Sequence, residues 1–72
     1  MDISELSKSE LDKIIDEYII NMQNADRNRK LMKRRLFDGV TYQMLAEEFN
    51  LSIIATQKIY AKCMKIIIKH IN

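Results

Sequence analysis

Four lysines in the last third of the chain are spaced so that they can act together on a polyanion. They recur four, three and four positions apart, as Lys58, Lys62, Lys65 and Lys69. This spacing places all four on one face of an α-helix. Ammonium groups gathered on one face can bind the phosphates of a nucleic acid.

A second basic cluster lies in the middle of the chain. Half of the 12 basic residues fall within residues 27–35, namely Arg27, Arg29, Lys30, Lys33, Arg34 and Arg35. No acidic residue lies between them, so their mutual repulsion is costly without counterions, which favours a phosphate-facing role. The alternative is a solvated helix face, which is the ordinary role of a charge run.

The charge is distributed unevenly along the chain. The net charge is only +2, yet residues 1–26 carry two basic and seven acidic groups, whereas residues 27–72 carry ten basic and three acidic groups. A basic surface attracts polyanions, and nucleic acid is the commonest polyanion in the cytoplasm. We therefore expect a nucleic acid as a partner.

The other reactive side chains do not predict an enzyme, a metal site or a cofactor. His70 has no nearby cysteine or carboxylate, and Glu47 and Glu48, as neighbours on a helix, point in different directions. Cys63 is the single cysteine and sits among apolar neighbours, so we expect it to pack as a small hydrophobic residue. An unpaired cysteine also fits a reducing compartment such as the cytoplasm.

Composition predicts one all-α domain over residues 1–72. The chain has no proline and a single glycine, and 72 residues provide only one core. The longest run of isoleucines, residues 66–68, is closed by Lys69, and no basic stretch followed by an apolar one begins the chain. Neither membrane insertion nor secretion is expected.

The first of four predicted helices begins near Ser7. Ser7 and Glu10 form a Ser-x-x-Glu capping box, and apolar residues then recur at helical spacing as Leu11, Ile14, Ile15, Tyr18 and Met22. This amphipathic helix is predicted to run to about Asn24. Residues 1–24 are thus predicted to hold an N-terminal helix, and residues 25–72 a trihelical core.

The second predicted helix runs from a cap at Asn24 or Asp26 to just before Gly39, which can adopt a left-handed backbone conformation. Its expected buried residues are Leu31, Leu36 and Phe37.

The third helix and the start of the fourth form a tight pair. Thr41 is expected to cap the third helix. The residues of this helix that are expected to point inward are Leu45, Ala46 and Phe49. Asn50 can take a left-handed conformation in the turn, Leu51 fills the angle between the helices, and Ser52 caps the next helix. The last helix is predicted over residues 53–71, with apolar residues over an arc of roughly 220°. An arc this wide needs a further partner, such as a second subunit.

The segment from Thr41 to Ser52, Thr-Tyr-Gln-Met-Leu-Ala-Glu-Glu-Phe-Asn-Leu-Ser, resembles the helix-turn-helix of sigma factor region four. Over nearly its whole length the chain is similar to small phage and prophage proteins of this helix-turn-helix type. The resemblance implies phage gene control, with a recognition helix over about residues 53–62 that lies in the major groove of double-stranded DNA. The DNA-facing residues that it implies on this helix are Ser52, Ile54, Ala55, Gln57, Lys58 and Lys62.

The resemblance also assigns contacts to the preceding helices. Thr41 and Tyr42 would meet the DNA backbone, and Arg34 and Arg35 would contact phosphates. Ile54 is apolar where the family usually has a long polar or basic residue, so it can offer only contact with a thymine methyl.

Two hypotheses follow from the sequence. The first is a DNA-binding transcriptional regulator. The second is a protein-binding module that uses the same scaffold and its Ile-rich last helix to bind or inhibit a host protein such as RNA polymerase. A homodimer through the C-terminal helix is compatible with either.

Overall fold

Four α-helices follow a short 3-10 turn in the computed structural model, which describes residues 2–72. The turn spans Ile3–Glu5, and the helices are α1 (Lys8–Tyr18), α2 (Ala25–Asp38), α3 (Tyr42–Glu48) and α4 (Ile53–Ile71). The part of the chain that is described contains no strand, which confirms the all-α prediction.

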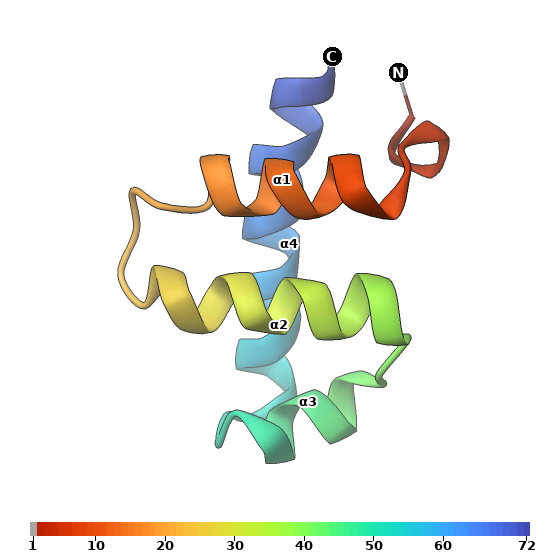
Figure 1. Cartoon of the computed structure of the whole chain (residues 1–72). Helices are drawn as coiled ribbons and strands as arrows, with labels where there is room; N and C mark the ends of the chain where they lie inside the picture. The colour runs from red at the N-terminus through yellow and green to blue at the C-terminus, as the bar shows by residue number, and fades with distance from the viewer. Residues whose placement is uncertain (1) are drawn as a thin grey trace.

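The helices pack in two directions. In Figure 1, α1 and α2 lie side by side and run in opposite directions, while α4 crosses behind both of them. The short α3 lies beneath α2, at the N-terminal end of α4. One side of α4 is therefore covered by the other helices, and the opposite side is left to the solvent.

Helix α1 begins at the predicted capping box. The Ser7 hydroxyl accepts a hydrogen bond from the Glu10 backbone N–H at 3.1 Å, and the Glu10 carboxylate accepts one from the Ser7 N–H at 3.2 Å. Two otherwise unpaired donors of the first turn are satisfied in this way.

The predicted end of this first helix was wrong, because α1 stops at Tyr18 rather than near Asn24. Ile19 leaves the helical conformation while its side chain stays fully buried. Its carbonyl accepts a hydrogen bond from the Arg29 guanidinium at 2.7 Å. A side chain from α2 thus satisfies a terminal carbonyl that a longer helix would have paired internally.

Helix α2 is bounded by two left-handed residues. Asn24 holds the N-cap position with a φ of 57°, but its side chain makes no capping hydrogen bond, so the predicted side-chain cap is absent there. Gly39 has a φ of 65°, as predicted for the C-terminal end. The Val40 N–H then reaches back to the Arg34 carbonyl at 3.4 Å and closes the helix end.

The predicted turn between α3 and α4 is confirmed in detail. Thr41 caps α3 by accepting from the Met44 N–H at 3.2 Å, and Ser52 caps α4 by accepting from the Ala55 N–H at 3.0 Å. Between them Asn50 has a φ of 56°. The Leu51 N–H donates to the Ala46 carbonyl at 2.8 Å, which closes the end of α3 at the turn.

The core is formed by all four helices. Its buried apolar residues are Leu11, Ile15, Ile19, Leu31, Met32, Val40, Leu45, Ala46, Cys63 and Ile67. On α2 the predicted Leu31 is buried, whereas Leu36 and Phe37 are only half-buried at the edge of the core. Within residues 2–72, no helix is both long and apolar enough to cross a membrane.

Candidate nucleic-acid interface

Helix α4 turns a basic side to the solvent. Its buried residues are Thr56, Cys63 and Ile67, which mark the side that packs on the other helices. At 3.6 residues per turn the four lysines fall within about 60° of one another, almost opposite these buried residues. All four are exposed, and we call Lys58, Lys62, Lys65 and Lys69 the lysine row.

No side-chain carboxylate of the described residues compensates the charge of the lysine row. Helix α4 contains no aspartate or glutamate, and no salt bridge of the described residues joins a lysine of the row to a side-chain carboxylate. Lys58 and Lys69 are 11 positions apart, which corresponds to about 16 Å along the helix axis. The row thus spans several phosphates of a DNA strand, which repeat about every 3.4 Å along the axis.

The residues predicted to face DNA at the start of α4 have different exposures. Ile54 is 64% exposed, more than any other large apolar residue described, and Gln57 is exposed beside it. Ala55 is half-buried, and the Ser52 oxygen is already engaged in the helix cap. The exposed side chains at the start of α4, after the Ser52 cap, are therefore those of Ile53, Ile54, Gln57 and Lys58.

The basic cluster of α2 is largely engaged inside the protein. Lys33 lies 3.1 Å from an Asp12 oxygen and 2.6 Å from an Asp16 oxygen, so it joins α2 to α1. Hydrogen bonding to Asp16, followed by Asp12, outweighs the effect of burial and raises the pKa of Lys33. Arg29 pairs with Asp26, next to its contact with the Ile19 carbonyl.

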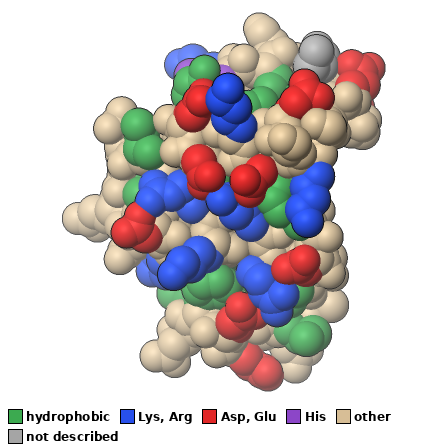
Figure 2. Space-filling view, viewed as in Figure 1, with side chains coloured by type: hydrophobic (Ala, Val, Ile, Leu, Met, Phe, Trp, Pro, Cys, Tyr) green, Lys and Arg blue, Asp and Glu red, His purple; other side chains and the backbone are tan. Residues whose placement is uncertain are grey.

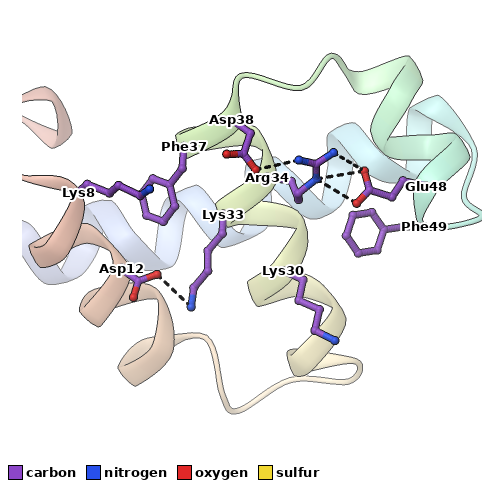
Figure 3. A pocket seen from close by; sticks show the side chains of 9 residues that line it. All are labelled: Lys8, Asp12, Lys30, Lys33, Arg34, Phe37, Asp38, Glu48 and Phe49. Atoms are coloured by element: carbon purple, nitrogen blue, oxygen red, sulfur yellow. Dashed lines mark hydrogen bonds and ion pairs between the residues drawn. The ribbon is translucent and has the colours of Figure 1, made fainter.

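Arg34, a predicted phosphate ligand, has two carboxylate partners. Its Nε and Nη2 atoms donate to the two oxygens of Glu48 at 3.0 Å each, and Nη1 donates to Asp38 at 2.8 Å. Figure 3 shows the guanidinium held between these two acids. A phosphate bound by Arg34 would have to displace the Glu48 carboxylate from the guanidinium.

Arg35, the other predicted phosphate ligand on α2, packs against aromatic rings. Its guanidinium donates to the Val40 carbonyl at 2.9 Å and lies 4.3 Å from the centre of the Tyr42 ring. Tyr42 in turn makes an edge contact with Tyr60, with 5.7 Å between ring centres. Burial, and to a lesser degree Tyr42, raises the pKa of Tyr60, which the positive charge of Arg35 partly opposes.

Thr41 and Tyr42 lie at the predicted start of α3, where the Thr41 hydroxyl accepts the cap hydrogen bond from Met44 and the Tyr42 ring is half-buried. Their contact with the DNA backbone stays a prediction, as do the phosphate contacts of Arg34 and Arg35. Two members of the lysine row were not among the predicted DNA-binding residues. They are Lys65 and Lys69, which lie further along the same side of α4.

The face formed by α1 and α2 is less suited to a polyanion than the row. Figure 2 shows basic and acidic side chains intermixed over this face. A groove of about 600 Å³ opens here, between α1, α2 and the end of α3. Lys33 and Arg34 pair with acidic residues of this groove, as Figure 3 shows, and the Lys8 ammonium lies 5.3 Å from the centre of the Phe37 ring.

The remaining reactive side chains, Cys63 and His70, take part in packing contacts. Cys63 is fully buried, as predicted, and burial raises the pKa of its thiol. His70 is exposed and stacks on Tyr18, with 3.6 Å between ring centres. In the described part of the chain no three His, Cys, Asp or Glu residues are grouped so that they could hold a metal ion.

No protein-family model, curated protein or solved structure matches the chain. The candidate interface is therefore defined by its own geometry.

Proposed function

We propose that this protein is a DNA-binding transcriptional regulator of the phage or prophage type, which places residues 53–62 of α4 in the major groove. The observation that carries the proposal is the lysine row, four exposed cations on one side of a helix that has no acidic residue. An α-helix fits the major groove, whose width is about 12 Å. The row would then contact phosphates, while Ile54 and Gln57 face base edges.

The caps at the N-terminal ends of α3 and α4 support this docking. Ser52 and Thr41 fix the ends of α4 and α3 by hydrogen bonds within the protein, so the exposed first turns of α4 are held in place before DNA binds. Preorganised contacts lose less conformational entropy on binding.

The test is a fluorescence anisotropy titration of labelled mixed-sequence duplex DNA with the protein, at several salt concentrations. We expect saturable binding that weakens steeply with salt, because each neutralised phosphate releases counterions. Absence of binding at low salt would rule the proposal out. Equal affinity across all salt concentrations would exclude the lysine row as the binding surface.

A second candidate function is a protein-binding module that binds or inhibits a host protein such as RNA polymerase. Two isoleucines on the solvent side of α4 favour it, since Ile54 is 64% and Ile68 43% exposed. Ile68 is too far along the helix to share a groove contact with Ile54, since about 21 Å separates them. Purified RNA polymerase is the probe, and Ile68→Gln should weaken its binding while leaving duplex affinity unchanged.

The same isoleucines could form a homodimer contact. Ala61 lies midway between Ile54 and Ile68, seven positions from each, so two antiparallel α4 helices could cross at this small residue. Eight lysines would then be brought together, which opposes pairing without a bound polyanion. Sedimentation equilibrium with and without duplex DNA measures this directly.

A further inference from the structure

A polar groove of about 420 Å³ lies beside the lysine row, and Lys62 of the row is one of the residues that line it. It is bounded by the connection between α1 and α2, by the first turn of α2 and by the middle of α4. The polar residues that the argument needs are Asn21, Gln23, Arg27 and Lys62. We call this the anion groove.

The anion groove carries two positive charges and no acidic residue among those that line it. Arg27 donates from Nε and Nη2 to the Asn28 side-chain oxygen, at 3.1 and 3.0 Å. This acceptor is neutral, so the charge of the guanidinium is not cancelled. Lys62 belongs to the lysine row and likewise has no salt bridge to a described carboxylate.

The two cations act on the same part of the molecule although they come from different helices. Burial raises the pKa of the Cys63 thiol, and the nearby charges of Lys62 and Arg27 each act in the opposite direction. Both charges therefore lie close enough to Cys63 to lower the pKa of its thiol. An anion in the groove would meet both of them.

Exposed amides complete the lining. Asn21 and Gln23 lie in the connection between α1 and α2 with exposed side chains, and each amide can donate two hydrogen bonds. A phosphate offers several acceptor oxygens and a negative charge, which matches a guanidinium, an ammonium and two amides. Two apolar residues, Ile59 and Ile66, form the rest of the α4 side of the groove.

We propose that the anion groove holds a backbone phosphate of duplex DNA that is bound along α4, with Arg27 and Lys62 as its charged ligands. The proposal rests on the DNA-binding function proposed above. Lys62 is shared between the row and the groove, so a strand that follows the row reaches the groove without a break. The connection between α1 and α2 thereby becomes part of the interface.

Arg27→Gln tests the charged contact, with Lys13→Gln on α1 as a control of equal charge change. Lys13 is exposed and has no salt bridge to a described carboxylate. The measurement is the slope of log affinity against log salt for a mixed-sequence duplex. We expect the slope to be shallower by about 0.9 in Arg27→Gln, unchanged in Lys13→Gln, and restored in Arg27→Lys.

Gln23→Glu provides a second variant that leaves the Arg27 hydrogen bonds to the buried Asn28 intact. It places a carboxylate in the groove, where it should weaken duplex binding several-fold at 0.1 M salt. Ser9→Glu, on the exposed side of α1, is its charge-matched control and should bind as the unmodified protein does. Thermal unfolding of each variant shows whether the fold is retained.

The outcomes separate this proposal from the function on which it rests. If the unmodified protein binds no duplex, the DNA-binding function fails. If it binds duplex but both groove variants behave as their controls do, only the anion groove is overturned. Calorimetric titration with inorganic phosphate should show no saturable binding, and saturable binding that Arg27→Gln abolishes would instead assign the groove to free phosphate.

Discussion

The guanidinium of Arg34 on α2 and the carboxylate of Glu48 at the end of α3 form a two-pronged ion pair, with two nitrogen–oxygen distances of 3.0 Å. The planar fork of an arginine matches a carboxylate in this geometry. The pair joins α2 to the helix-turn-helix and occupies donors that the sequence suggested for phosphate.

Replacement of Arg34 should therefore affect folding more than DNA binding. We expect Arg34→Gln to lower the midpoint of urea unfolding, because Glu48 and Asp38 lose a shared partner. The salt slope of duplex binding should change by less than half of the value of about 0.9 expected for one phosphate. Urea unfolding and salt-dependent anisotropy of the same variant measure both effects.

Glu48→Gln is the complementary variant. If the Arg34–Glu48 pair serves the protein fold, the double variant should have the same unfolding midpoint as Arg34→Gln, because Arg34→Gln already breaks the pair. Additive losses would show that the two side chains act independently. If Arg34→Gln instead makes the slope of log affinity against log salt shallower by about 0.9, the value for one phosphate contact, Arg34 belongs to the DNA interface.

The buried thiol of Cys63 should be unreactive in the folded protein. Alkylation by iodoacetamide should be slower than in urea by on the order of 100-fold or more, because small domains with about 3–5 kcal/mol of stability open rarely. Rapid labelling of the native protein would show that α4 separates easily from the core. Lys13→Gln serves as a variant that should label at the native rate.

Alkaline pH should weaken the fold through the same residue. Burial raises the pKa of the Cys63 thiol above its ordinary value of 9.0, so the unfolded chain loses this proton first. Stability contributed by the neutral thiol is complete below pH 9.0 and decreases as the pH rises above that value. Cys63→Ala should flatten this part of the curve of unfolding free energy against pH, and an identical curve would contradict the assignment.

Local interactions made much of this fold predictable from sequence. The caps at Ser7, Thr41 and Ser52 and the left-handed turn residues Gly39 and Asn50 all depend on neighbours within a few positions. Each needs a residue type that few others can replace. The helix boundaries that these residues define are accordingly those expected.

Long-range contacts account for what could not be predicted. Helix α1 ends earlier than predicted, and Arg29, ten positions on, donates a hydrogen bond to the Ile19 carbonyl that a longer helix would have paired internally. Two of the acids that compensate the basic cluster of α2 are distant in sequence. Asp16 lies 17 positions before Lys33, and Glu48 lies 14 positions after Arg34. A count of charges along the sequence cannot reveal such partners, so the basic cluster looked more available for phosphate than it is.

Ile54 and Gln57 should give the protein a preference for A·T pairs. The methyl group of thymine can contact Ile54, and adenine presents a donor and an acceptor to Gln57 in the major groove. Replacing thymine by uracil in an A·T-rich duplex removes the methyl group and should weaken binding by about four-fold, on the basis of about 0.8 kcal/mol for one buried carbon. Anisotropy titrations with the two duplexes measure the difference.

Ile54→Ala is the matched variant for this base contact. It should bind thymine and uracil duplexes with nearly equal affinity, while its salt slope stays that of the unmodified protein. A thymine preference that persists in Ile54→Ala would assign the methyl contact to another residue.

The most direct test of the DNA-binding account is the salt dependence of duplex affinity for the double variant Lys58→Ala/Lys62→Ala. Its control is Lys8→Ala/Lys13→Ala on α1, which changes the net charge equally. The account predicts that the slope of log affinity against log salt becomes shallower by about 1.8 in the first variant, for two lost phosphates, and is unchanged in the control. A slope that is unchanged in Lys58→Ala/Lys62→Ala would contradict the assignment of α4 as the DNA-binding helix.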